Sequence, residues 1–428
     1  MSADGGRPPL SRRAFLGTAA LGTVVVGGAA AGGIKLASSG RDGDGDGPDP
    51  EPPRGFRGYH QIGVLEHPAP HGLLAAFSCV DGDRAALAET FRELSQELDA
   101  LMSGRVPPET DPELPPPDSG VLMEVTDPGL MATVSVGASL FDHRYGLAER
   151  KPSELVTMPF LANDRLDPAR SHGDVLLSLQ GKERDVCVHA LRRIMRRTRS
   201  GLVLHWTQDT FTRPDAKRKV GQTQSRNLLG FKDGTANPDA ADQSLMDTLV
   251  WTSTADAALG APGREPAWTV GGTYQVVRLI RMMVERWDRA ALAEQEAIFG
   301  RHKVTGAPLS GDRETDAPDY AGDPEGKRIP LTAHIRLANP RDDRTKDKVL
   351  VRRGMSYSRG MDGAGLLDQG LAFVSYQRRL SHFLETNERL KGEALEEYVR
   401  PEGGGFFYVL PGVVEIGDWL GRSLLAPQ

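Results

Sequence analysis

At the centre of the 428-residue chain stands the stretch Gly230-Phe231-Lys232-Asp233-Gly234-Thr235-Ala236-Asn237-Pro238, between two halves that share one order of expected elements. Glycines flank a single acid, and a proline follows. Such a backbone can bend tightly and come close to a flat ligand. An acid held in place there could carry protons, whereas a solvated turn of the same composition would do no chemistry. Residues further along the chain decide between these two interpretations.

The half before this stretch predicts the order β-α-β-β-α-β, which is that of a ferredoxin-like unit. Its first helix follows Asp83, which can cap it, and carries apolar residues every three or four positions. The expected elements are a strand at 73–79, the helix after Asp83, strands at 131–137 and 174–180, a helix at 184–199 and a strand at 201–209.

The half after the stretch repeats this order, with a long polar insert at 301–349. Long loops inside compact domains usually serve a function. We therefore expect an α+β fold of two ferredoxin-like halves packed together, of the dimeric α+β barrel type, with a site where 230–238 meets 301–353. The expected elements are a strand at 273–284, a helix at 288–299 capped by Asp288, strands near 350–357 and 370–377, a helix at 378–391 and a strand at 405–410.

The N-terminal residues read as an export signal. A twin-arginine motif, Ser-Arg-Arg-Ala-Phe-Leu, stands at 11–16, and a moderately apolar run rich in Gly and Ala follows it. We expect a signal peptide at 1–40 and a disordered acidic Pro/Gly linker at 41–57. The folded halves would then be 58–238 and 239–428. The predicted location is the cell envelope or the extracellular space; an uncleaved signal that anchors the chain is the alternative.

Composition limits the classes of function. The net charge of −6 provides no basic surface for nucleic acid. Cys79 and Cys187 lack the spacing of a zinc or iron–sulfur site and lie in apolar contexts, which predicts free, buried thiols. Core packing is the expected role of each of the five tryptophans, so none is singled out for electron transfer.

His334 and Arg352 are the downstream residues that favour chemistry at Asp233. One histidine, one acid and one arginine do not make a zinc or di-iron site, but they suit peroxide chemistry at haem. A neutral imidazole can bind haem iron on one face. On the open face, a carboxylate can move a proton between the two peroxide oxygens. A guanidinium beside it can stabilise the negative charge that develops as the O–O bond breaks.

The first six residues of the central stretch resemble the Gly-Phe-x-Asp-Gly signature of the dye-decolourising peroxidases. The resemblance is greatest to the twin-arginine branch, which includes the deferrochelatase/peroxidases of bacterial iron uptake, and it covers nearly the whole mature chain. Further similar segments are 136–142, 172–177, 271–278, 298–301, 334–341, 368–371 and 403–407.

This resemblance implies two ferredoxin-like halves that bind one haem b per chain. It implies that His334 is the proximal ligand, Asp233 the distal acid/base and Arg352 the distal arginine, which also contacts the haem. A proximal histidine usually donates its second nitrogen to a carboxylate, for which Glu396 or Glu397 is the candidate. The other haem contacts that it implies are Gly234, Thr235, Ala236, Arg301, Asn339, Pro340 and Arg341, with the Arg301 fork suited to a propionate.

One position departs from the pattern, since some relatives carry an asparagine two residues after the distal arginine and this chain has Gly354. We therefore do not expect an asparagine to assist peroxide activation. The implied activity is reduction of hydrogen peroxide with oxidation of an organic reductant. The alternatives are a deferrochelatase, which releases iron and leaves the porphyrin intact, and a secreted haem carrier, which would not need the Asp233–Arg352 pair. A homodimer and an iron-uptake permease are the protein partners to test.

Overall fold

The computed structural model describes residues 55–108, 111–123, 125, 127–214, 225–257 and 264–426. The expected signal peptide and most of the expected linker lie outside these ranges. Near the start of the described part, Phe56 is buried in the core and Arg57 forms a bridge with Val413. In the described part, no helix is both long and apolar enough to cross a membrane.

The first half has the predicted order of elements. Asp83 caps the first helix, where its carboxylate accepts a hydrogen bond from the Ala86 N–H at 2.9 Å. Both cysteines are free and buried, as expected. The elements are β1 (His71–Cys79), α1 (Arg84–Met102), β2 (Met131–Gly137), β3 (Val175–Gly181), α2 (Arg184–Arg197) and β4 (Leu202–Phe211), followed by α3 (Gln243–Leu249).

The second half repeats the order with two corrections: the strand expected near 350–357 is interrupted at 353–354, and one helix begins later than expected. The helix expected at 288–299 begins only at Leu292, and Asp288 ends a separate short helix instead of capping it, since its N–H binds the Val284 carbonyl. The elements are β5 (Thr273–Met282), α4 (Val284–Trp287), α5 (Leu292–Phe299), α6 (His334–Ala338), β6 (Val351–Arg352), β7 (Met355–Met361), β8 (Leu367–Gln377), α7 (Leu380–Leu390), β9 (Val399–Val409) and α8 (Arg422–Leu425).

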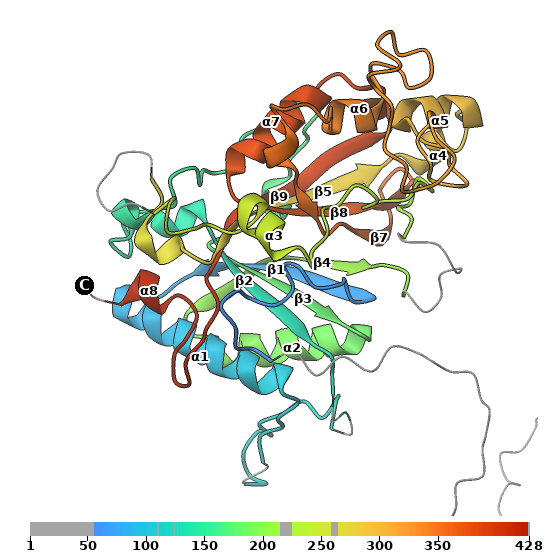
Figure 1. Ribbon diagram of the computed structural model, residues 1–428. Coiled ribbons are helices and arrows are strands. Elements are labelled where there is room, and N and C mark those ends of the chain that lie inside the picture. The colour runs from blue at the N-terminus through green and yellow to red at the C-terminus, as the bar shows by residue number, and fades with distance from the viewer. Residues whose placement is uncertain are drawn as a thin grey trace, which may run out of the picture. The chain divides into compact units, whose positions relative to one another are not determined.

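The strands of both halves join into one antiparallel sheet (Figure 1). The order is β5-β9-β2-β3-β1-β4-β7-β8-β6, and β5 also pairs with β8, so the ladder closes on itself. The halves meet edge to edge where β2 pairs with β9 and β4 with β7. Two ferredoxin-like halves joined in this way are the predicted barrel type.

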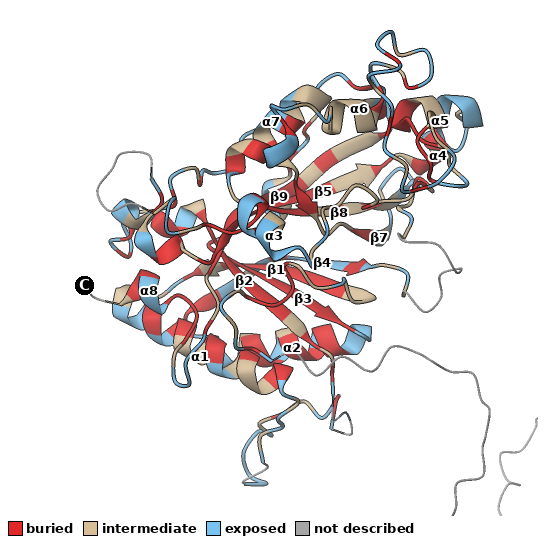
Figure 2. Cartoon of the chain, viewed as in Figure 1, coloured by how far each residue is buried: buried red, intermediate tan, exposed pale blue. Residues whose placement is uncertain are grey.

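The alternation of side chains along β5 separates the core from the site. Val277 and Leu279 face the interior of the ring, where they pack with Trp206 from the other half. Arg278, Ile280 and Met282 point to the opposite face and line a pocket. Helices α1 and α2 cover the outer face of the first half, whereas α5, α6 and α7 lie on the side of the second (Figures 1 and 2).

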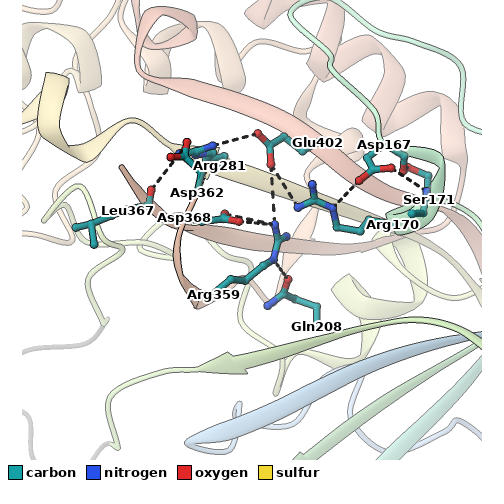
Figure 3. Close-up of polar contacts among 11 residues, drawn as sticks. Asp167, Arg170, Ser171, Gln208, Arg281, Arg359, Asp362, Leu367, Asp368 and Glu402 are labelled. Carbon is teal, nitrogen blue, oxygen red and sulfur yellow. Dashed lines mark hydrogen bonds and ion pairs between the residues drawn. The ribbon is translucent and has the colours of Figure 1, made fainter. Parts of the chain in front are cut away.

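A network of ion pairs joins the halves at one edge of the ring (Figure 3). Glu402 of β9 lies 3.6 Å from Arg170 and 4.0 Å from both Arg281 and Arg359. The Arg359 Nε–H also donates to Gln208 of β4 at 2.7 Å. These contacts connect strands of the second half to the first half. They therefore stabilise the arrangement of the sheet on which the pocket lies.

Candidate active site

A cavity of about 280 Å³ opens on the outer face of the second half. Three segments enclose it: the central loop (230–238), the insert (301–349) and α7. Apolar side chains such as Ile280, Phe299 and Phe373 supply much of its wall. The predicted site residues that line the cavity are Asp233, Gly234, Thr235, Ala236, Arg301, His334, Asn339, Arg341 and Arg352; Pro340 does not line it.

Asp233 and Arg352 form an ion pair in this cavity. The Arg352 Nη1 lies 3.3 Å from the Asp233 Oδ1, and each side chain keeps about a quarter of its surface exposed, 28% and 25%. The backbone N–H of Asp233 donates to the Ser225 carbonyl at 3.0 Å. A carboxylate and a guanidinium that are fixed and still accessible can together handle a proton and a developing negative charge.

Asn237 connects the central loop to the strand that carries Arg352. Its Nδ2 donates to the Arg352 carbonyl at 2.7 Å, and its Oδ1 accepts from the Arg352 N–H at 3.1 Å. The amide therefore satisfies both backbone groups of Arg352, as a neighbouring strand would do. Sequence reasoning gave Asn237 no role, although it lies in the quoted stretch.

His334 is the first residue of α6, and its ring contacts a carboxylate that the sequence analysis did not identify. Its Nδ1 lies 2.8 Å from the Glu393 Oε2, and the Glu393 side chain is only 7% exposed. Since a carboxylate can only accept, Nδ1 donates and Nε2 remains for a ligand. Burial lowers the pKa of His334, but the attraction of Glu393 outweighs it, and the pKa is raised.

The predicted carboxylate partners of His334 were therefore wrong. Glu396 instead accepts a hydrogen bond from the Gly392 N–H at 3.0 Å, and Glu397 pairs with Arg286 at the surface. A turn after α7 places Glu393, and not the residues that follow it, next to the imidazole. No pattern in the sequence distinguishes these three glutamates, because the fold of that turn decides which of them points inward.

Arg301 and Arg341 bring positive charge to one side of the cavity. Arg301 is 6% exposed and donates to the carbonyls of Gly306 and Glu314 at 2.6 and 3.1 Å. Burial lowers its pKa, and the nearby charges of Arg341 and Arg352 lower it further. Within the described ranges, neither Arg301 nor Arg341 has a carboxylate within ion-pair distance. Both guanidinium groups can therefore bind an anion.

The backbone at Arg341 is strained, which is a second sign of function at this edge. Its φ of 60° lies in the left-handed region, where residues with a Cβ are uncommon. Strain of this kind persists where the surrounding structure imposes it, and it clusters at ligand sites.

All five tryptophans are buried, at 8% exposure or less, which confirms the prediction of core packing.

Comparison with known proteins covers both halves of the chain. Residues 61–212 match the family model described as Dyp-type peroxidase, N-terminal, and residues 224–414 match Dyp-type peroxidase, C-terminal. Curated proteins named deferrochelatase are 49% identical over 373 residues. The match spans 86% of this chain and 86% of the protein from Escherichia coli O157:H7, and 86% and 87% for that from Shigella flexneri.

Solved structures agree with these matches. The DyP-type peroxidase from Cellulomonas bogoriensis has a TM-score of 0.76 at 33% identity, over 87% of this chain and 98% of its own. Ferric DtpA from Streptomyces lividans has a TM-score of 0.78 at 31% identity, over 88% and 98%. The similarity therefore extends through sequence, fold and nearly the full length of the solved chains.

Proposed function

The chain belongs to the Dyp-type peroxidase family and is a haem-dependent peroxidase, and we propose that Asp233, Arg352 and His334 carry its chemistry. The observation that supports these roles most strongly is that one cavity contains all three, although Asp233 and Arg352 are 119 positions apart. Hydrogen peroxide is the oxidant and an organic reductant the electron donor.

The residues of the cavity fit a haem b. His334 has Nδ1 bound to Glu393, and its Nε2 has no hydrogen-bond partner among the described residues, which is the arrangement of an imidazole that ligates iron. Arg301 and Arg341 offer guanidinium groups to the propionates, whose carboxylates a guanidinium binds well. Apolar side chains on the walls suit the porphyrin. We propose further haem contacts through Gly234, Thr235, Ala236, Asn339, Arg352 and, just outside the cavity lining, Pro340.

When bound, the haem iron supplies the redox chemistry that splits the peroxide and oxidises the reductant. Asp233 would accept a proton from one peroxide oxygen and return it to the other, which departs as water once the O–O bond breaks. Arg352 stabilises the negative charge on that oxygen and holds the Asp233 carboxylate in place. Glu393 accepts the His334 Nδ1–H, fixes the ring and makes it a stronger donor.

An absorption spectrum of the purified, haem-supplied protein tests this proposal. We expect a Soret band that changes on addition of one equivalent of hydrogen peroxide, and loss of most haem affinity in His334→Ala. A protein that binds haem but shows no spectral change with peroxide would be a carrier, and the proposed peroxidase roles would be wrong.

Deferrochelatase activity is the second candidate, and the curated relatives at 49% identity favour it. It would use the same cavity but give a different product, metal-free porphyrin together with released iron. Fluorescence of the free porphyrin, measured after incubation with haem under reducing conditions, distinguishes the two. Accumulation of intact porphyrin supports the second candidate, whereas a constant haem content excludes it.

We propose export by the twin-arginine route to the cell envelope or the extracellular space, based on the motif at 11–16 and the apolar run after it. Replacement of Arg12 and Arg13 by lysine should keep the protein in the cytoplasm, and N-terminal sequencing of the exported form should show whether the signal is removed.

We also propose tests for two protein partners. Sedimentation would detect a homodimer, and co-purification would detect an iron-uptake permease.

A further inference from the structure

Glu314, in the insert, contacts residues of the central loop on both sides of Asp233. Its carboxylate pairs with the Lys232 ammonium, and its Oε1 accepts from the Thr235 hydroxyl at 3.2 Å. Its backbone carbonyl accepts from the Arg301 guanidinium at 3.1 Å. One residue, which the sequence analysis did not single out, thus contacts the loop that carries the acid and an arginine of the cavity.

The ion pair between Lys232 and Glu314 lies in the interior. Their side chains are only 4% and 7% exposed. A buried charge pair adds little net stability, but the removal of one partner leaves an uncompensated charge and is costly. Such a pair therefore favours one arrangement of the two segments over others.

Glycines allow the insert to approach the loop this closely. A Cβ on Gly230 would lie 2.7 Å from the Lys303 side chain, and a Cβ on Gly306 would lie 2.6 Å from that of Lys232. Both glycines have positive φ, at 85° and 78°. Arg226 adds hydrogen bonds to the carbonyls of Gly230, Lys303 and Val304. The loop and the insert therefore share an extensive contact, and the ion pair of Glu314 with Lys232 is its charged part.

We propose that Glu314 is a positioning residue for the peroxide reaction, because it fixes the central loop so that Asp233 stays beside Arg352. This inference rests on the proposed role of Asp233. Asn237 holds the loop to the Arg352 strand, and Glu314 holds it to the insert. Arg226 also joins the loop to the insert, but at Gly230, whereas Glu314 binds the residues on both sides of Asp233. Loss of the Glu314 contacts therefore lets Asp233 move relative to Arg352, and a displacement of about 1 Å can cost roughly 100-fold in rate.

Hydrogen exchange on the haem-free Glu314→Gln protein tests the attachment without any activity. We expect the loop amides, among them the Asp233 N–H, to exchange at least about ten-fold faster than in the parent protein, while those of β5 stay unchanged. The matched control is Glu325→Gln, which removes an exposed ion pair with Lys327 in the same insert and should leave loop exchange unchanged. Unchanged loop exchange in Glu314→Gln, or equal acceleration in β5, would overturn the proposal.

Steady-state kinetics of the haem-loaded variant test its catalytic consequence. The kcat/KM for peroxide should fall at least about ten-fold, whereas the kcat/KM for the reducing dye should stay within about two-fold. Equal losses in both would overturn the proposal, since a merely weakened fold affects both. If the parent enzyme shows no peroxide turnover, the function proposed above fails, and the exchange result still decides the attachment.

A double variant guards against loss of folding, because Glu314→Gln alone leaves the Lys232 ammonium buried without its partner. Lys232→Met/Glu314→Gln removes both charges and keeps an acceptor for Thr235. It should fold like the parent and still show faster exchange confined to 230–238. Parent-like loop exchange in this folded variant would contradict the proposal.

Discussion

The side-chain amide of Asn237 binds both backbone groups of Arg352, at 2.7 and 3.1 Å, and so joins the loop of Asp233 to the strand of Arg352. Asp233 and Arg352 therefore keep their spacing partly through a contact that involves neither of their charged groups.

Asn237→Ala should slow the peroxide reaction by about ten- to 100-fold and lower the free energy of unfolding by roughly 1–3 kcal/mol. It leaves the Arg352 backbone groups unpaired and lets the strand shift against the loop. Stopped-flow absorbance and thermal unfolding measure the two effects. Asp239→Ala, at an exposed turn residue nearby, is the control; equal rates in both variants would exclude a positioning role for Asn237.

Glu393→Gln should weaken haem affinity or activity by about 10- to 100-fold and raise the reduction potential of the iron. The neutral amide can still accept from His334, but it no longer increases the electron donation of the ring. Redox titration of the haem band measures the potential. Glu397→Gln, which removes a surface ion pair with Arg286, should match the parent. A reduction potential that changes in Glu397→Gln but not in Glu393→Gln would contradict the assignment of Glu393 as the partner of His334.

The stability of the haem-free protein should depend on pH through His334. Its folded pKa is raised by Glu393, so the pair contributes stability that is fully present below the unfolded pKa of about 6.5 and is lost as pH rises through the folded value. The Tm difference between the parent and Glu393→Gln should therefore be larger at about pH 6 than at about pH 9. A difference that grows with pH would contradict this sign.

Arg341→Gln should weaken haem binding by roughly 10- to 150-fold, which corresponds to a hydrogen bond with a charged group of about 1.5–3 kcal/mol. Haem titration followed by absorbance measures this loss. The control is Arg328→Gln, whose guanidinium pairs with Asp319 at the surface of the same insert. Equal affinities in Arg341→Gln and the control would remove Arg341 from the anion side of the cavity.

The order of elements could be predicted from the sequence because each half buries sheet and helix faces whose apolar spacing is visible. The break between α4 and α5 could not be predicted in this way. Trp287 is fully buried and donates its Nε1–H to the Leu229 carbonyl, so a tertiary contact ends α4 where local propensity would continue a helix.

The residues that share the cavity could be predicted where a motif carries them and were missed where the fold alone brings them there. The family signature identifies Asp233. The chemistry of imidazole and guanidinium side chains then indicates His334 and Arg352 as its partners. Glu393 and Glu314 belong to no motif. Their positions depend on how a turn and a long insert fold over the cavity, which no local pattern encodes.

We propose that Asp233 moves the proton during the peroxide reaction. Stopped-flow absorbance of the haem-loaded Asp233→Asn protein after mixing with hydrogen peroxide tests it most directly. We predict that the variant keeps its haem and its Soret band and reacts at least about 100-fold more slowly than the parent, because general acid–base catalysis contributes that much or more. A variant that keeps its haem and reacts at the parent's rate would contradict the claim.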